Sequence, residues 1–517
     1  MNKKLHPLML AGTGSDVGKS VVATALCRIF LQDGYHPAPF KAQNMALNSY
    51  ATPDGLEIGR AQAVQAEAAG LECHTDMNPL LLKPQSDHTS QVVLHGRPIG
   101  NRDAYDYWKP LPTSPKGKSA LRSAMSPPLG GGSEGLDFRQ EVCAAFDRLA
   151  ARYNPIVMEG AGSISELNLR HHDLVNMPMA RHAGADVILV ADIDRGGVFA
   201  SAYGSIFLQE PDDRRRIKGI IVNKFRGDLR LFDDGRQLLE RICQVPVLGV
   251  IPYFNDIHIE GEDSVALEAG RQRVTDGGTD GRLSIAVVRL PHISNYTDFD
   301  MLQQDSRLHV GYTSRADELD GADVVILPGT KSTLADLQWL RQQGLAEAIL
   351  RAHREGKTVL GICGGYQMMG AEVLDPQHVE GSLERLPGLG LLPVSTTMNG
   401  QKVTRQVECE FGRGYEIHQG ETLPLAGADV TPLTTLTDGR VAGYMASRRC
   451  MGTYVHGILD NPAFVDFLLQ PFAHRLGRRQ PMLSHEDFKQ QQYDRLAQHV
   501  RQHLDMQKLY EILTTDD

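Results

Sequence analysis

The chain has 517 residues, of which 41% are hydrophobic and 22% are charged, and its formal net charge is −10. This length exceeds that of one ordinary domain, and the composition is typical of a globular protein in water. The negative charge and an isoelectric point near 6.0 argue against a general nucleic-acid binder. No apolar run reaches the length of a membrane span, and the first residues contain too short an apolar run for a signal peptide. The seven cysteines form no CxxC pair, so the sequence indicates neither a disulfide framework nor a zinc site, and we expect the protein in a reducing cytoplasm. The sequence does not indicate the oligomeric state.

Apolar runs alternate with helical stretches in the first half of the chain. Each run ends in small or polar residues: PLMLAG, PIVMEGAG, DVILVADID and KGIIVNKF. Strands that alternate with helices predict a mostly parallel, doubly wound sheet with helices on both faces. We expect this α/β domain to occupy residues 1–267.

The first strand leads into MLAGTGSDVGKS, residues 9–20, and an amphipathic helix follows. Glycines let the backbone wrap a phosphate, a lysine supplies a point charge, and a hydroxyl after it can hold Mg²⁺. The loop is a variant, since Thr13 stands where a glycine is usual and Gly12 lies one position further out. This variant resembles the loop of dethiobiotin synthetase and its relatives. The predicted ATP-binding residues of the loop are Gly12, Thr13, Gly14, Gly18, Lys19 and Ser20.

Polar side chains follow three later strands, and ligands in open α/β sheets bind at such carboxyl ends. Glu159 and Asp192 are candidates to hold Mg²⁺ with Ser20, directly or through water. An aspartate after a strand can instead cap the next helix, and Asp194 is in the same position as Asp192. Asn223, in IVNKF, is predicted to contact the adenine of ATP, although a turn role is nearly as good an interpretation.

Two segments differ in composition from the rest. Pro110 to Phe138 is rich in Pro, Gly and Ser and reads as a surface loop. A glycine-rich stretch with few apolar residues predicts an inter-domain linker at 268–281. A second α/β domain follows over residues 282–475, with LSIAVVRL, DVVILPG and TVLGICGG as strands. The polar tail, 476–517, has apolar positions at helical spacing and is expected to pack on a domain surface.

One cysteine stands between glycines in GICGGYQMMG, directly after a predicted strand. Strand, tight turn and helix in this order resemble a nucleophile elbow, in which Cys363 would project above the sheet. The alternative is a buried cysteine that acts only as a small hydrophobe.

A reactive thiol needs a general base. His456, in YVHGIL, is the preferred candidate, and His418, in GYEIHQG, is the alternative. Backbone N–H groups near Gly329 and at Gly364 are predicted to form an oxyanion hole.

The motifs PGTKST, GICGGYQMMG, GYEIHQG and YVHGIL occur in the order of the class I glutamine amidotransferases, which the second half resembles. Many members carry a glutamate two residues after the histidine, where this chain has Ile458. In this respect the chain resembles the branch that amidates cobyrinic acid, whose members work with Cys and His alone. The missing glutamate leaves open which residue orients His456.

In the first half, FKAQNMALNSY, EGAGSISELNL and LVADIDRGGVFAS resemble the cobyric acid synthase family. The resemblance implies an enzyme that uses ATP, Mg²⁺ and glutamine to amidate the b, d, e and g carboxylates of adenosylcobyrinic acid a,c-diamide. Glutamine and the corrinoid would be its small-molecule partners. The alternatives are a cobyrinic acid a,c-diamide synthase and a nucleotide-switched binding module.

Overall fold

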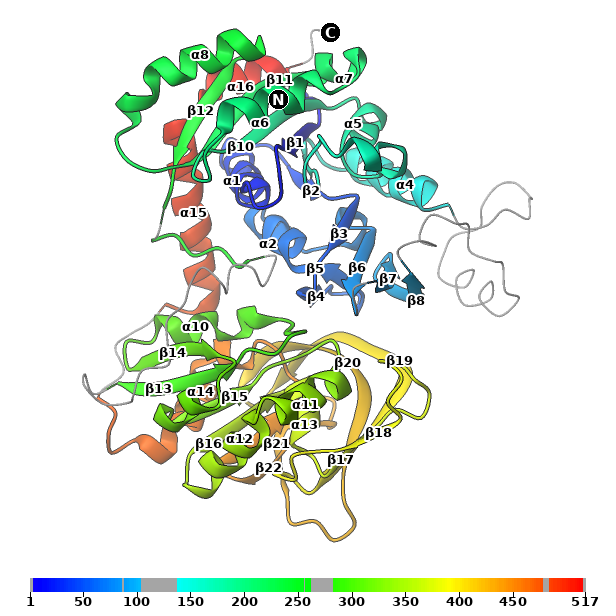
Figure 1. Ribbon diagram of the computed structural model, residues 1–517, viewed down its shortest axis with the longest axis vertical. Helices are drawn as coiled ribbons and strands as arrows, with labels where there is room; N and C mark the ends of the chain where they lie inside the picture. The colour runs from blue at the N-terminus through cyan, green and yellow to red at the C-terminus, as the bar shows by residue number, and fades with distance from the viewer. Residues whose placement is uncertain are drawn as a thin grey trace.

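The computed structural model describes residues 3–85, 88–103, 137–254, 256–261, 282–477 and 483–514. They form two α/β lobes, one above the other in Figure 1. The fold predicted from the sequence, two α/β domains, is therefore confirmed. The predicted linker, 268–281, and residues 110–136 of the predicted loop lie outside the described residues, and a helix begins at Phe138, the last residue of that loop.

The upper lobe is built on a parallel sheet of six strands in the order β12-β11-β10-β1-β9-β2. The strands are β1 (Leu8–Gly12), β2 (Ala38–Phe40), β9 (Ile156–Glu159), β10 (Asp186–Asp192), β11 (Ile217–Phe225) and β12 (Val247–Pro252). The order reverses beside β1, so the carboxyl end of β1 lies at the switch point where such sheets bind ligands. Because helices cover both faces, β1, β9 and β10 are buried along their whole length, as their unbroken apolar sequences predict.

Most helices of this lobe follow the strands as crossover connections. They are α1 (Lys19–Gln32), α2 (Arg60–Ala68), α4 (Phe138–Ala150), α5 (Met177–Ala183), α6 (Val198–Phe207), α7 (Pro211–Arg216) and α8 (Asp233–Cys243). Short 3-10 turns lie at η1 (Thr75–Met77), η2 (Leu167–His172) and η3 (Leu229–Phe232).

Two small sheets extend the upper lobe toward the lower one (Figure 1). One has the order β3-β6-β7-β8 and the other is the hairpin β4-β5. Their strands are β3 (Gln43–Met45), β4 (Ser49–Ala51), β5 (Glu57–Gly59), β6 (Leu80–Pro84), β7 (Thr89–Leu94) and β8 (Arg97–Asp103).

The lower lobe contains a seven-stranded sheet in the order β14-β13-β15-β16-β23-β22-β21, in which β22 and β21 run antiparallel to their neighbours. Its strands are β13 (Leu283–Val288), β14 (Leu308–Thr313), β15 (Val324–Leu327), β16 (Thr358–Ile362), β21 (Thr431–Thr435), β22 (Val441–Ser447) and β23 (Cys450–Thr453). A second sheet, β18-β17-β19-β20, is formed by β17 (Glu372–Leu374), β18 (Arg385–Pro387), β19 (Val394–Cys409) and β20 (Gly412–Pro424).

Helices cover the main sheet of the lower lobe on both faces (Figure 1). They are α10 (Asp300–Gln304), α11 (Thr333–Gln342), α12 (Leu345–Arg354), α13 (Gly364–Met369) and α14 (Pro462–Leu469), with 3-10 turns η4 (Tyr296–Phe299), η5 (Asp317–Gly321), η6 (Ile458–Asp460) and η7 (Gln470–Phe472).

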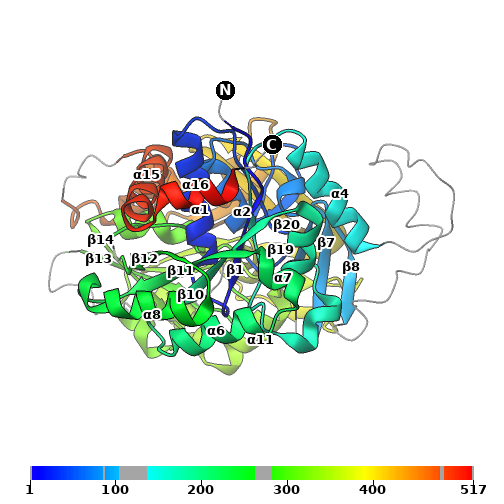
Figure 2. The same ribbon diagram turned by 90° about the horizontal axis from the view of Figure 1, so that it is seen from above.

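The C-terminal tail returns to the upper lobe. Its helices are α15 (His485–His503) and α16 (Met506–Leu513), and α15 lies beside α1 in both views (Figures 1 and 2). Their buried faces join one hydrophobic cluster with β1 and α1, in which the Phe30 and Tyr510 rings lie 5.8 Å apart. The described part of the tail is thus helical and packs on the surface of the upper lobe.

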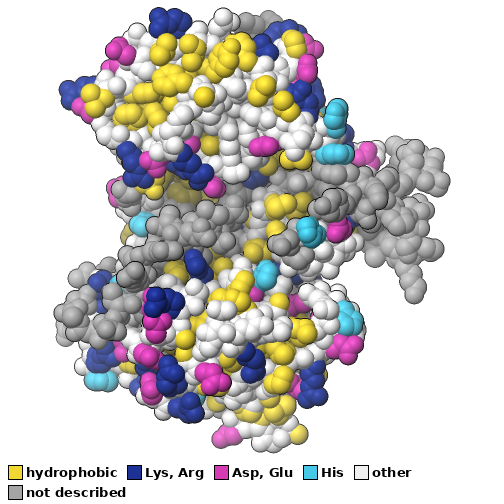
Figure 3. Space-filling view, viewed as in Figure 1, with side chains coloured by type: hydrophobic (Ala, Val, Ile, Leu, Met, Phe, Trp, Pro, Cys, Tyr) yellow, Lys and Arg dark blue, Asp and Glu magenta, His cyan; other side chains and the backbone are white. Residues whose placement is uncertain are grey.

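The two lobes touch through β4 and β20, where Ala51, Tyr415 and Ile417 form a small apolar cluster. A buried ion-pair group lies in the same interface: Glu57 of the upper lobe accepts from Lys83 at 2.7 Å and from Lys402 of the lower lobe. On the face in Figure 3, positive and negative side chains are interspersed rather than gathered by sign. No helix within the described ranges combines the length and the apolarity needed to cross a bilayer.

Candidate active sites

Cys363 stands on a sharp turn between β16 and α13. Its backbone has φ 52° and ψ −112°, a region that non-glycine residues rarely adopt and that is typical of strained functional turns. The turn fits against the loop after β15 only because Gly365, two residues further on, has no side chain: a Cβ added there would lie 2.0 Å from the Leu327 carbonyl oxygen. The Cys363 side chain is 6% exposed, and its Sγ lies 3.5 Å from the Ile417 carbonyl oxygen. The sequence therefore places one thiol at the carboxyl end of the central strand.

The imidazole of His456 lies at the end of the neighbouring strand, β23, and is held by Asp298. The Nδ1 atom is 2.7 Å from Asp298 Oδ2, and the Gly457 backbone N donates to Asp298 Oδ1 at 3.0 Å. Because an ionised carboxylate only accepts, Nδ1 carries a proton and Nε2 is the atom left for chemistry. Asp298 thus fills the orienting role that the sequence left open, and Ile458 is a fully buried apolar residue.

The surroundings of His456 favour its charged form. Burial alone would lower its pKa, but the nearby carboxylate of Asp298, its hydrogen bond and the interaction with Cys363 raise the pKa to about 10. Within the described residues Nε2 has no partner at hydrogen-bond geometry, so Cys363 influences it from nearby without a well-formed hydrogen bond. A protonated imidazole next to a thiol stabilises the thiolate.

His418, the alternative base, has a different environment. Burial lowers its pKa to about 3, its Nδ1 lies 3.1 Å from the Gly420 carbonyl oxygen, and its ring stacks on Tyr454 at 3.8 Å. These contacts are those of a neutral structural histidine. The geometry favours His456 as the partner of the thiol.

The two predicted oxyanion-hole glycines lie beside this pair. A Cβ at Gly329 would lie 3.1 Å from the His456 ring, and a Cβ at Gly364 would lie 2.6 Å from the Thr330 side chain. The loop after β15 and the turn after β16 therefore pack directly on each other. Their role as an oxyanion hole stays a prediction.

The phosphate loop of the upper lobe closes around Lys19. Its Nζ donates to the carbonyl oxygens of Gly14 at 3.0 Å and Gly162 at 2.9 Å. A Cβ at Gly12 would lie 2.6 Å from that Nζ, which explains a glycine one position outside the usual pattern. Gly18 has φ 93°, and Thr13 is anchored by its backbone N to the Val190 carbonyl oxygen at 3.1 Å. All the predicted loop residues are thus brought to the carboxyl end of β1.

Glu159 lies within the same site. Its Oε1 accepts from Ser20 Oγ at 2.8 Å and from Lys41 Nζ at 2.9 Å, and its Oε2 accepts from Gln65 Nε2 at 2.7 Å. One hydroxyl and one carboxylate are the sparse protein ligands with which Mg²⁺ binds nucleotide phosphates, so Ser20 and Glu159 fit that ion. Among the described residues no three His, Cys, Asp or Glu side chains are grouped to hold a metal by themselves.

Asp192 and Asn223 are held by other contacts. Asp192 lies 3.0 Å from Lys224 Nζ and also accepts from the Asp194 backbone N at 2.7 Å. Asn223 Nδ2 donates to the Val17 carbonyl oxygen at 2.9 Å, so it braces the phosphate loop. The metal role of Asp192 and the adenine contact of Asn223 stay predictions.

Sequence reasoning missed Asp298, Lys41 and Gln65. Lys41 and Gln65 follow no phosphate-loop pattern, and Asp298 is separated from His456 by 158 residues. A local signal exists for Lys41, which follows the apolar run APF, because a charged residue at a strand end is a ligand candidate.

Comparisons with known proteins agree with this division of the chain. Residues 8–265 match the CobQ/CobB/MinD/ParA nucleotide binding domain, and residues 284–464 match the CobB/CobQ-like glutamine amidotransferase domain. The chain is 64% identical to a cobyric acid synthase of Bacteroides fragilis and 61% identical to one of Phocaeicola vulgatus, each over 100% of both chains. It is 51% identical to a cobyric acid synthase of Parabacteroides distasonis over 99% of each chain.

Proposed function

The chain belongs to the cobyric acid synthase family, and from this premise we propose that it converts adenosylcobyrinic acid a,c-diamide into adenosylcobyric acid. It is a glutamine-hydrolysing ligase, and the four carboxylates amidated would be b, d, e and g. We assign carboxylate activation to residues 1–267 and glutamine hydrolysis to residues 282–475. The observation that carries the proposal is the Cys363–His456–Asp298 arrangement in the same chain as a phosphate loop.

In the lower lobe, the Cys363 thiolate attacks the carboxamide carbon of glutamine. His456 then gives its proton to the departing nitrogen, which leaves as ammonia, and water hydrolyses the thioester to glutamate. Backbone N–H groups near Gly329 and at Gly364 would stabilise the tetrahedral oxyanion. Asp298 keeps the imidazole oriented through both transfers.

In the upper lobe, the acceptor carboxylate takes the γ-phosphoryl group of ATP and becomes an acyl phosphate. Ammonia attacks this carbon, and phosphate leaves in place of the oxide that a free carboxylate could not release. Lys19 would hold the phosphate charge during transfer, and a Mg²⁺ held by Ser20 and Glu159 would supply further charge neutralisation. Asn223 keeps the loop backbone in place.

The proposal is tested by the mass of the product from purified protein, ATP, glutamine and the diamide. Four amidations are expected, whereas two amidations of cobyrinic acid would indicate an a,c-diamide synthase. Failure to form glutamate from glutamine would favour a nucleotide-switched binding module instead. The Cys363→Ala variant should lose activity with glutamine and keep it with ammonium salts, and loss of both would contradict the assigned role.

A further inference from the structure

A pocket of about 580 Å³ opens on the upper lobe at the carboxyl end of β9. Its floor is residues 161–164, the segment that also closes the phosphate loop. Gly162 O accepts from Lys19 Nζ at 2.9 Å, and the Ile164 backbone N donates to Gly12 O at 3.1 Å. Residues 161–164 therefore contribute both to the pocket lining and to the closure of the phosphate loop.

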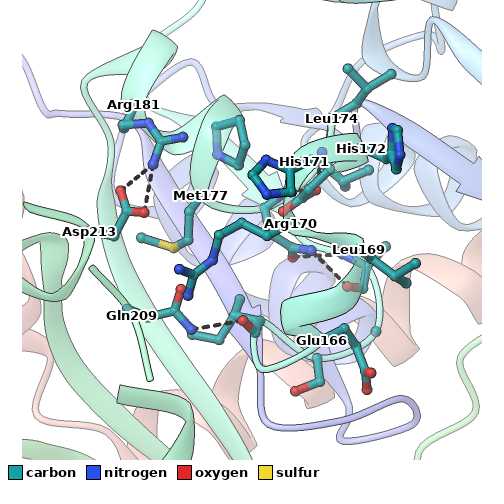
Figure 4. A pocket seen from close by; sticks show the side chains of 18 of the residues that line it. Glu166, Leu169, Arg170, His171, His172, Leu174, Met177, Arg181, Gln209 and Asp213 are labelled. Carbon is teal, nitrogen blue, oxygen red and sulfur yellow. Dashed lines mark hydrogen bonds and ion pairs between the residues drawn. The ribbon is translucent and has the colours of Figure 1, made fainter. Parts of the chain in front are cut away.

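Arginines project into the pocket from both walls. In Figure 4, Arg170 comes from η2 together with His171 and His172, and Arg181 lies on the opposite wall with Asp213. Arg181 is held by both oxygens of Asp213, at 2.5 and 2.6 Å, and Arg170 is held by a carboxylate of Glu210 at 2.7 Å. These two acids therefore serve to position the guanidinium groups.

Arg139 differs from the other two arginines. Its guanidinium donates to the backbone carbonyl of Asp173 at 3.0 Å, and among the described residues this guanidinium pairs with no carboxylate. The Asp173 carboxylate is used locally, because its Oδ1 accepts from the backbone N of Val175 at 2.7 Å. Glu166 is the remaining acid of the wall and is exposed. Arg139 is thus the cation best placed to receive an anionic group from outside.

The pocket also offers apolar surface. Leu169 at the rim is 54% exposed, and Leu174 and Met177 line the interior. A cationic group beside apolar walls fits a ligand that joins a large apolar body to several carboxylates.

We propose that this pocket binds the acceptor, a macrocyclic polycarboxylate of the corrinoid class, which rests on the function proposed above. One non-reacting carboxylate pairs with Arg139, and the apolar ring lies against Leu169. A second carboxylate reaches the floor near Gly162, next to the phosphate site. If different carboxylates of the acceptor paired with Arg139 in successive rounds, a different carboxylate would face the phosphate site each time.

The test is equilibrium binding of the diamide, followed by its visible absorbance, without ATP. Arg139→Gln should weaken binding about tenfold, the effect of losing one hydrogen bond to a charged group. The KM for the diamide should rise, whereas glutaminase activity should not change. Arg152→Gln, at the other end of α4 and outside the pocket, is the matched control and should bind as the wild type does.

Two other outcomes are decisive. Normal affinity of Arg139→Gln for a diamide that the wild type binds would overturn the pocket assignment and leave the proposed function standing. No binding of the diamide to the wild type, with or without ATP, would overturn both.

A second inference rests on a row of side chains in contact between the two lobes, in which the Tyr50 and Tyr415 rings meet edge to face. The Arg60 guanidinium lies 4.6 Å from the centre of the Tyr50 ring, and the Tyr50 and Tyr415 rings are 4.8 Å apart. Tyr415 in turn stacks on His456 at 5.2 Å with an interplanar angle of 20°. Each contact depends on the position of its neighbour, so the row links α2 of the upper lobe to the imidazole of the lower lobe.

The same helix reaches the phosphate site. Gln65 of α2 donates to Glu159 Oε2 at 2.7 Å and to the Ser20 carbonyl oxygen at 3.5 Å. Nearly every residue of this nine-residue helix is buried, so α2 contacts its surroundings along its whole length. We infer that α2 couples occupation of the phosphate site to the orientation of His456 through Arg60 and the two tyrosines.

The test is the glutaminase rate with and without a non-hydrolysable ATP analogue. The analogue should change kcat/KM for glutamine about fivefold or more in the wild type, the lower end of usual coupling between sites. Tyr50→Leu should abolish the response and Tyr50→Phe should preserve it, since only the ring is required. The inference would be overturned if the analogue left kcat/KM of the wild type unchanged, or if Tyr50→Leu responded to the analogue as fully as the wild type.

Discussion

His456 is completely buried, a setting that ordinarily favours the neutral imidazole. Asp298 and Cys363 outweigh this burial and raise its pKa to about 10. Since this lies above the ordinary value of 6.5, the charged form is favoured in the folded chain. The resulting stabilisation is complete below pH 6.5 and disappears as the pH rises through 10.

Asp298→Asn removes the negative charge but keeps the shape of the side chain. We expect kcat for glutamine hydrolysis to fall roughly 10- to 100-fold, because a hydrogen bond to a charged group contributes about 1.5–3 kcal/mol. Amidation with ammonium salts should be retained, and a parallel loss of it would point to a structural defect. Steady-state kinetics with each nitrogen source measures both.

The same variant should change the pH dependence of glutamine hydrolysis. The alkaline limb reports loss of the imidazolium proton. Without Asp298 the pKa of His456 falls, so the limb should move to lower pH. A pH–rate profile of kcat/KM is the measurement, and an unmoved limb would contradict the assignment of Asp298.

The participation of Asp298 could not be predicted from its surroundings in the sequence. Nothing in NYTDFD differs from an ordinary turn, and the contact arises only when η4 packs beside η6. Cys363, His456 and Lys19 can be proposed from the sequence because each follows a predicted strand in a glycine-containing motif with a chemical rationale. Glycines that allow two backbone segments to pack closely form recognisable local motifs, whereas a carboxylate far along the chain from its histidine partner has no such motif.

At the scale of elements, the turn between β16 and α13 depends on the absence of side chains. The loop after β15 lies so close that Gly365 meets the carbonyls of Leu327 and Pro328. Both are backbone atoms and cannot rotate away. The thiol turn and the proposed oxyanion loop can therefore pack this closely only because residue 365 carries a hydrogen atom in place of a side chain.

Gly365→Ala should destabilise the lower lobe and abolish glutamine hydrolysis. Its Cβ would lie 2.0 Å from a carbonyl oxygen, and overpacking of this kind costs typically 1–3 kcal/mol or more. Gly381→Ala is the control, because nothing lies within 4 Å of its added Cβ. Thermal unfolding and glutaminase assays of both variants give the comparison, and equal behaviour would refute the steric argument.

The predicted strands of both main sheets are confirmed. Their signal is strongest in β1, β10, β15 and β16, which are rich in apolar residues and buried along their whole length. The small sheets were not predicted. β8 is largely exposed, and most positions of β19 after Met398 are intermediate or exposed, so neither strand has a strong apolar signal. Such strands depend on partners that are distant in sequence.

At the scale of the whole molecule, the first domain is assembled from two separate parts of the chain. Residues of α15 and α16 complete the cluster around β1 and α1. Arg28 of α1 also pairs with Asp494 of α15 at 2.8 Å. The phosphate loop begins α1, so its support depends on the end of the chain.

Leu496→Ala should lower the free energy of unfolding of the upper lobe by about 2–5 kcal/mol, since Leu496 is fully buried in this cluster. Gln498→Ala, exposed on the same helix, should change it little. Nucleotide raises the unfolding temperature of the lobe that binds it, which identifies the transition to follow. A shift confined to the other transition would contradict the packing described.

The return of the tail also has a consequence for biosynthesis. A ribosome making this chain completes the second domain while the first still exposes the apolar groove that α15 and α16 will fill. Until Leu513 has left the exit tunnel, the apolar groove of the nascent first domain stays exposed to solvent. Chaperone dependence should therefore persist until α15 and α16 emerge, rather than end when residue 267 emerges.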